Sequence, residues 1–210
     1  MPPPVLLDGL SALEDVLGAE NVLPTVARYA VFLHPQTVAQ AGRRALFPII
    51  RAEGFERRGS QIELAGSAVI TCDNLSPTHA FLWAAGRSKG PDIQFNHIWP
   101  SKRDPSLYTA LWNLCVTPAF LAKLTDNHPA VVAAIRCRAH DLYGCLPEGQ
   151  RRPPEPTGYA SLQWAPHPPA VANVEAVFRG RMATVRSSRC TVAATRIGWT
   201  FSGFNPDPTV

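Results

Sequence analysis

The sequence predicts an α+β fold, with a small mixed sheet between a helical N-terminal part and a helical C-terminal extension. Three observations favour this class. Apolar residues recur at helical spacing near both ends, short β-branched segments occupy the middle, and 21 prolines among 210 residues imply many fixed turns. No apolar run approaches the roughly 20 residues of a membrane helix. We therefore expect a cytoplasmic protein without a membrane partner.

The N-terminal part, residues 1–55, is expected to be helical. Ser11 followed by Glu14 has the spacing of a capping box and predicts the start of a first helix. Apolar residues recur through 23–33 and again through 35–50, which predicts further helices in these two stretches.

The middle part, residues 56–146, is expected to be the α+β core. Segments 61–64 and 67–72 read as two short strands on either side of a turn, because β-branched residues fill the second segment. The turn that follows, residues 72–77, is rich in side chains that bond their own backbone. A short apolar segment continues over 78–85.

Two further strands and two helices complete this core. Residues 92–99 and 113–116 are the predicted strands. Thr117 stands where the N-cap of a compact helix belongs, with proline at the first helical position. A longer helix is predicted over 129–142, with Gly144 as its stop.

The C-terminal part, residues 147–210, is predicted to be a proline-rich linker and a basic helical extension. Helices are expected over 169–184 and 191–197. Five arginines of this extension are candidates for contacts with nucleic acid: Arg179, Arg181, Arg186, Arg189 and Arg196. Such a cluster suits a phosphate backbone, and a solvated helix face is the alternative.

Charge and cysteine content narrow the function classes. The chain has 20 Lys and Arg against 16 Asp and Glu, which gives a net charge of +4. Its five cysteines form no C-x-x-C pair, so the spacing argues against a zinc knuckle and against a disulfide framework. No phosphate-binding glycine loop, G-x-S-x-G or H-E-x-x-H motif occurs.

The segment with the strongest chemical signal runs from Phe95 to Asp126. A histidine, His97, ends one predicted strand, and an asparagine, Asn113, begins the next. Hydrolysis of a phosphodiester needs a base for the attacking water and a hard cation held by oxygen ligands. A neutral imidazole and an amide oxygen can supply these two functions.

These residues, His-Ile-Trp-Pro at a strand end, Asn-Leu at a strand start and a short helix, resemble the HNH, or ββα-metal, nucleases over about 91–128. The resemblance implies that His97 is the general base. It implies that Asn113 either orients the histidine or binds the metal, and that Asn96 occupies the ligand position before the histidine. The implied cofactor is Mg²⁺, or Mn²⁺.

The resemblance also implies a third ligand from the helix, where the matching position falls near Ala122. Lys123, Asp126 or Asn127 would have to substitute, with Lys123 as a catalytic candidate and Asp126 as a metal ligand. Two loop residues, Lys102 and Arg103, lie where such enzymes hold the phosphate backbone.

The sequence therefore predicts a metal-dependent DNA endonuclease, with double-stranded DNA as the expected partner, a role in restriction or defence, and a homodimer as an option. The alternative is a nucleic-acid-binding or protein-binding module that retains the fold without cutting. A third reading is a small-molecule enzyme that uses Cys115, paired with His97, or Asp73.

Overall fold

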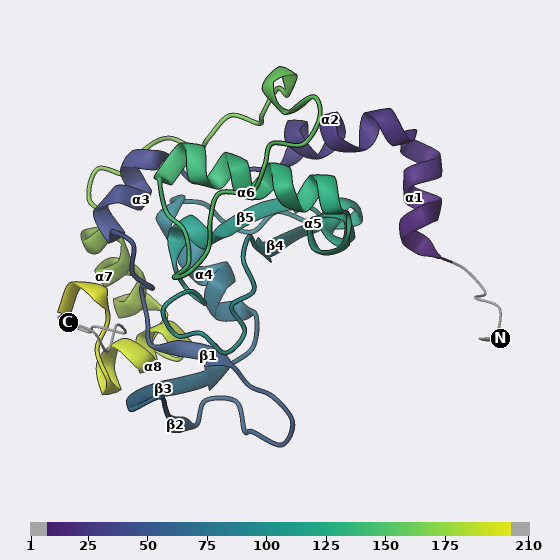
Figure 1. The fold of residues 1–210 in the computed structure, drawn as a ribbon. Helices are drawn as coiled ribbons and strands as arrows, with labels where there is room; N and C mark the ends of the chain where they lie inside the picture. Colours follow the sequence, from purple (N-terminus) through teal and green to yellow (C-terminus); the bar gives the residue numbers. More distant parts are fainter. Residues whose placement is uncertain (1–7, 203–210) are drawn as a thin grey trace.

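The computed structural model describes residues 8–202 and shows the expected α+β class. The N-terminal part forms α1 (Gly9–Leu17), α2 (Ala19–Tyr29) and α3 (Pro35–Ala41), with α1 projecting from the body of the molecule (Figure 1). The expected cap at Ser11 is wrong. Asp8 caps α1 instead, because its carboxylate accepts hydrogen bonds from the backbone N–H groups of Leu10 and Ser11.

The mixed sheet has the strand order β1-β3-β2. Strand β3 (Ser67–Cys72) pairs parallel with β1 (Ile49–Arg51) and antiparallel with β2 (Gln61–Leu64), so the predicted bounds of β2 and β3 are confirmed. Of the helix expected over 35–50, only α3 forms, and the prediction is wrong for the rest of the segment. Gly42 ends α3 with a φ of 66°, and the chain then enters β1 as a buried strand.

A separate hairpin lies outside this sheet. Strand β4 (Ile93–His97) pairs antiparallel with β5 (Leu114–Pro118), and η1 (Leu111–Asn113) leads into β5. The chain continues as η2 (Ala119–Leu121) and α5 (Ala122–Asn127). The expected helix cap at Thr117 is wrong, because Thr117 is a buried residue of β5 whose hydroxyl accepts a hydrogen bond from Asn96.

Two helices flank the hairpin. Helix α6 (Pro129–Tyr143) runs beside α2 and α5, and α4 (Leu75–Ala84) packs between β5 and the C-terminal helices (Figure 1). Helix α6 begins at a proline and ends at Gly144 in the left-handed conformation, as predicted. Every helix in residues 8–202 is too short or too polar to cross a membrane.

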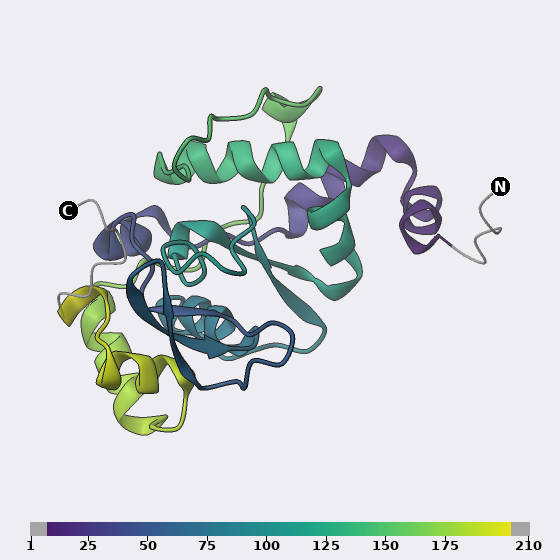
Figure 2. The same ribbon diagram turned by 60° about the horizontal axis from the view of Figure 1, so that its bottom comes forward.

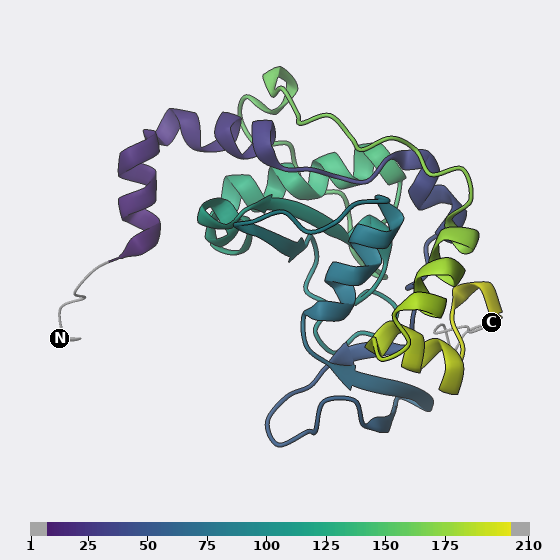
Figure 3. The same ribbon diagram turned by 180° about the vertical axis from the view of Figure 1, so that it is seen from behind.

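The C-terminal extension folds onto the same core. After η3 (Tyr159–Ser161), the chain forms α7 (Val174–Thr184), α8 (Arg189–Arg196) and η4 (Thr200–Ser202). Figures 2 and 3 show α7 and α8 beside the mixed sheet and α4. Trp199 stacks on Phe47 at 5.8 Å between ring centroids, and Phe178 packs against the same ring at a tilt, at 5.9 Å. A single cluster of buried apolar residues therefore includes members of all three predicted parts.

Candidate active site

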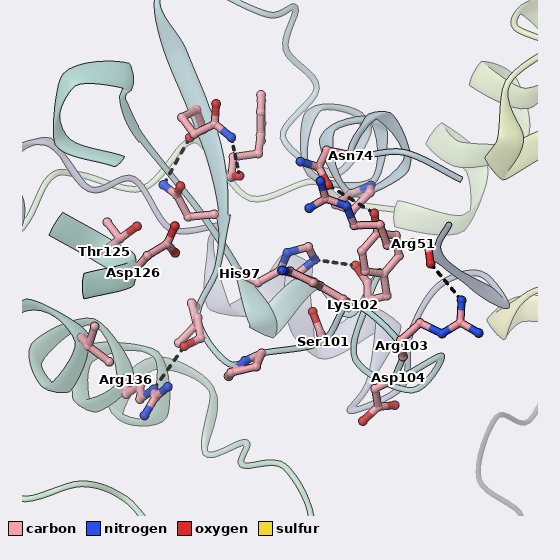
Figure 4. Close-up of a pocket in the computed structure, with 18 residues that line it drawn as sticks. Arg51, Asn74, His97, Ser101, Lys102, Arg103, Asp104, Thr125, Asp126 and Arg136 are labelled. Carbon is pink, nitrogen blue, oxygen red and sulfur yellow. Dashed lines mark hydrogen bonds between the residues drawn. The ribbon is translucent and has the colours of Figure 1, made fainter. Parts of the chain in front are cut away.

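A cleft of about 900 Å³ opens beside the end of β4 (Figure 4). Its walls come from β1, β4, the loop 98–108, α5 and α6. The cleft brings together five of the side chains that the sequence singles out: His97, Asn96, Asp126, Lys102 and Arg103.

The contacts of His97 define which ring nitrogen is free to accept a proton. Its Nε2 lies 3.0 Å from the backbone carbonyl oxygen of Tyr108, and its ring stacks on the Tyr108 ring at 5.1 Å (Figure 4). A carbonyl oxygen only accepts hydrogen bonds, so Nε2 carries the hydrogen. In the neutral ring, Nδ1 is then the nitrogen with a free lone pair.

The surroundings of His97 favour this neutral form. Burial lowers the pKa of His97 below its ordinary value of 6.5, and the carbonyl of Tyr108 and the charge of Asp126 oppose this shift only in part. The imidazole is therefore neutral at pH 7. A neutral imidazole with an available Nδ1 has the protonation state that a general base needs.

Asn113 lies behind the cleft and is fully buried. Its Oδ1 accepts a hydrogen bond from the backbone N–H of Trp99 at 2.8 Å. Its Nδ2 donates to the carbonyl oxygens of Trp99 and Leu107 at 3.2 and 3.3 Å. Asn113 thus ties together both ends of the loop that follows His97, next to the Tyr108 carbonyl that fixes the imidazole.

Asn96 and Asp126 are the two residues of the cleft that the family resemblance predicts to be metal ligands. The Nδ2 of Asn96 donates to the hydroxyl of Thr117 at 2.9 Å, which leaves Oδ1 as the end of the amide that can accept or ligate. Asp126 is an exposed residue of α5 that reaches the cleft on the side of Thr125 (Figure 4). Lys123, on the same helix, is exposed and does not line the cleft.

The donor set fits a hard cation that keeps most of its water. No group of three or more His, Cys, Asp or Glu side chains is arranged for a metal within residues 8–202. Mg²⁺ is commonly held by one or two carboxylates together with waters and substrate phosphates. Asp126 with the amide oxygen of Asn96 matches this oxygen-only pattern, and Asn113 is already committed to the backbone.

The cations of the cleft include two that no sequence pattern indicates, Arg51 and Arg136. The Nε of Arg136 donates to the Ile98 carbonyl at 3.2 Å, and its guanidinium lies 4.2 Å from the centre of the Trp99 ring. Arg51 comes from β1. Their sequence surroundings give no signal, because they reach the cleft only through the packing of β1 and α6 beside the hairpin.

The two loop cations predicted to hold phosphate differ in their pairing. Lys102 is exposed, and its side chain has no hydrogen-bond partner among the described residues. Arg103 forms an ion pair with Glu56 and donates to the carbonyl oxygen of Arg51. Lys102 is therefore the freer of the two for an anionic ligand.

The five arginines of the C-terminal extension do not line the cleft. Arg179 forms an ion pair with Glu175 at 2.6 Å and lies over the Trp199 ring. The guanidinium of Arg189 packs against Gly59. The remaining three arginines, all exposed, are Arg181, Arg186 and Arg196.

The residues of the small-molecule reading lie apart from His97. In the hairpin register, Cys115 pairs with Asn96, whereas His97 pairs with Leu114. Cys115 is fully buried, and burial raises the pKa of its thiol to about 12. Asp73 lines a neighbouring pocket, where its Oδ1 accepts a hydrogen bond from the backbone N–H of Leu75 at 2.9 Å.

The cleft combines a neutral histidine, the carboxylates of Asp104 and Asp126, and three cationic side chains that can face an anion: Arg51, Lys102 and Arg136. This chemistry suits the binding of a phosphate group and the removal of a proton from a nucleophile next to it.

Comparison of the chain with models of protein families, with curated proteins and with solved structures found no match.

Proposed function

We propose that this protein is a metal-dependent endonuclease that hydrolyses phosphodiester bonds of DNA in the cleft beside His97. The observation that carries the proposal is the state of His97. Its Nε2 is held by the Tyr108 carbonyl, its pKa is lowered by burial, and it shares the cleft with Asp126 and several cations. We further propose that β4, β5 and α5 act together as a ββα-metal unit.

In the proposed reaction, water attacks the phosphorus atom of a bound phosphodiester. Nδ1 of His97 takes the proton of this water, the bond from phosphorus to the leaving oxygen breaks, and that oxygen takes up a proton from solvent water to leave as a hydroxyl. The cations Arg51, Lys102 and Arg136 hold the nonbridging oxygens, whose charge increases during the attack. Asn113 positions the loop, and through Tyr108 it keeps the imidazole in the required tautomer.

Asp126, together with the amide oxygen of Asn96, would hold Mg²⁺ or Mn²⁺. The bound ion supplies charge neutralisation at the phosphate and at the leaving oxygen. This arrangement depends on substrate oxygens to complete the ligand set, as is usual for Mg²⁺ in nucleotide sites.

The test is cleavage of plasmid and oligonucleotide DNA with Mg²⁺ or Mn²⁺ by the native protein and two variants. His97→Gln keeps an N–H donor for the Tyr108 carbonyl and removes the base, so we expect a rate loss of about 10²- to 10⁴-fold with DNA binding retained. The matched control is His79→Gln. His79 also has a pKa lowered by burial, but it lies in α4 and lines neither the cleft nor the adjacent pocket.

Equal cleavage by native protein and His97→Gln would overturn the assignment of the base. Salt-sensitive DNA binding by a native protein that cuts none of the substrates would favour the alternative, a nucleic-acid-binding module that retains the fold without hydrolysis. Neither cutting nor binding would exclude both, and would return attention to Asp73 and Cys115.

Three wider features remain part of the proposal. Five thiols without disulfides suit a reducing compartment such as the cytoplasm. A single cleft cuts one strand at a time, so cleavage of both strands is simplest for a homodimer with two-fold symmetry. A small nuclease with an additional basic region suits restriction or defence, which cleavage of modified against unmodified DNA would test.

A further inference from the structure

The cleft continues into a second pocket of about 530 Å³. Four residues line both: Arg51, Asn74, Gln94 and Phe95. Because the two pockets share these residues, they adjoin and together form one grooved surface. We call it the long groove; it extends from Arg136 and Asp126, past His97, to Arg58 and Lys89.

The charge of the long groove is mainly positive. Six cationic side chains line it, namely Arg51, Arg58, Lys89, Lys102, Arg103 and Arg136, against the three carboxylates of Asp73, Asp104 and Asp126.

Two of the three carboxylates are occupied by local contacts. Asp104 accepts hydrogen bonds from the backbone N–H and hydroxyl of Ser106, and Asp73 accepts one from the backbone N–H of Leu75. The only ion pair between residues that line the groove in residues 8–202 is the exposed one of Arg58 with Asp73, at 3.7 Å. An exposed pair at this distance is weak, so Arg58 is free to exchange its partner for a phosphate.

An exposed aromatic ring, Phe55, lies three residues before Arg58 in the sequence. Phe55 lies in the loop between β1 and β2, and its side chain is fully exposed. Glu56, which pairs with Arg103, separates Phe55 from Arg57 and Arg58, and Arg58 lines the groove. A phosphate-binding track next to an aromatic platform is the combination that proteins use to hold a single nucleic-acid strand, because every base can stack on such a ring.

We propose that the long groove binds one polynucleotide strand beyond the hydrolysed phosphate, with Arg58 and Lys89 on its flanking phosphates and Phe55 stacked on a base. This inference rests on the proposed function for the position of the hydrolysed bond. Neither the cleft chemistry nor the sequence pattern assigns Arg58, Lys89 or Phe55 to the substrate.

The test measures binding without cleavage, in buffer with EDTA, by fluorescence anisotropy of a labelled 12-nucleotide DNA single strand and of its 12-base-pair duplex. The salt dependence of affinity reports the number of phosphates contacted, at a slope of about 0.7 for each on a single strand. Arg58→Gln with Lys89→Gln should lower the slope by about 1.4. The control is Arg151→Gln, an exposed arginine that lines neither section of the groove.

Phe55→Ala should weaken single-strand affinity about tenfold and leave the salt slope unchanged, because stacking releases no counterions. An exposed side chain contributes little to stability, so this variant should keep the native melting temperature. Unchanged slopes in the double variant, or single-strand affinity unchanged in Phe55→Ala, would overturn the inference. The inference would also be overturned if both variants lost affinity for polyglutamate as much as for DNA. That result would indicate that the groove binds an acidic polypeptide.

The two proposals fail separately. Lowered slopes in a protein whose native form does not cut would support the groove and reject hydrolysis. Unchanged slopes in a protein that cuts would support hydrolysis and reject the groove.

Discussion

Two regions of the molecule carry basic side chains, and they differ in what surrounds those side chains. In the cleft, Arg51, Lys102 and Arg136 come from three distant segments and share one concave space with His97. In the C-terminal helices α7 and α8, the arginines lie on one stretch of chain and are spread over convex, mostly exposed helix faces. Tertiary packing therefore brings the cations of the cleft together, whereas the arginines of the tail lie near one another because they are close in the sequence.

A count of positive charges along the sequence therefore does not locate a binding site. The tail has the denser run of arginines in the sequence, yet Arg179 is paired with Glu175 and Arg189 packs on Gly59. The cleft has fewer cations per residue of chain, but they lie beside a base and a carboxylate. Convergence of different chemical groups is what distinguishes a candidate active site from a charged surface.

The largest expected difference between the cleft and the tail is the loss of stability when one asparagine in each region is replaced. Asn113→Ala would leave the backbone N–H and carbonyl oxygen of Trp99 without partners and remove one of two hydrogen bonds to the Leu107 carbonyl, at a cost of about 3 kcal/mol in the free energy of unfolding. Asn173→Ala in the tail removes an exposed N-cap contact to Ala176, which costs about 1 kcal/mol. Urea denaturation of both variants measures the difference.

Equal destabilisation by the two substitutions would contradict the role of Asn113 as the residue that holds the loop. If Asn113→Ala is the less stable variant, its cleavage should be tested at a temperature where it remains folded. A rate loss there would reflect the position of the loop rather than unfolding.

The next largest contrast concerns pH. Cleavage should fall about tenfold for each unit below the pKa of His97, because only the neutral imidazole accepts a proton. Burial lowers this pKa, so the half-maximal rate should lie below pH 6.5. The tail segment from Val174 to Arg196 contains no histidine, so DNA binding through it would not follow this curve. Single-turnover rates and anisotropy at the same pH values separate the two effects.

A half-maximal rate above pH 7 would contradict the buried, neutral state of His97. The same titration with His79→Gln serves as the control. His79 also titrates below its ordinary pKa, but it lies outside the cleft, so its removal should leave the profile unchanged.

Features that depend on local sequence could be predicted, and features that depend on tertiary packing could not. Strands β2 and β3 have the predicted bounds because their signal is local: β-branched residues flank the turn at Ala65 and Gly66, which both adopt positive φ. Helix α6 is predicted equally well, from its proline start and glycine stop. By contrast, residues 45–50 are buried on all sides, so their apolar spacing wrongly predicted a helix. The segment leads into β1, a strand that pairs with β3, which is distant in the sequence.

The site divides in the same way. His97, Asn96 and Asp126 could be identified because they belong to one pattern within the span 91–128, and the structure places all three on one cleft. Arg51 and Arg136 could not, because they join the cleft only after β1 and α6 pack beside the hairpin. The fully buried position of Asn113 was equally hidden, since an asparagine before a strand is more commonly a turn residue.

A smaller contrast is expected from neutralising cations in pairs. Arg51→Gln with Lys102→Gln removes two cations from the cleft and should lower the salt slope of DNA binding by close to one for each lost phosphate contact. Arg181→Gln with Arg196→Gln, the matched pair of exposed tail arginines, should change the slope by less. A larger slope change in the tail pair would mean that α7 and α8 are the main DNA-binding surface.

The smallest contrast is expected from two acidic residues that each hold one arginine. Glu56→Gln releases Arg103 at the edge of the cleft, where it can turn to a phosphate, and removes one negative charge. We expect DNA affinity to rise about two- to fivefold at low salt, because a partly exposed charge is screened by solvent and contributes little. Glu175→Gln makes the same change beside Arg179 in α7 and should leave affinity unchanged, because a free arginine on a convex helix face is not aimed at a bound strand. Anisotropy at 50 mM salt compares the two, and an equal gain from both variants would show that DNA responds to overall charge rather than to the cleft.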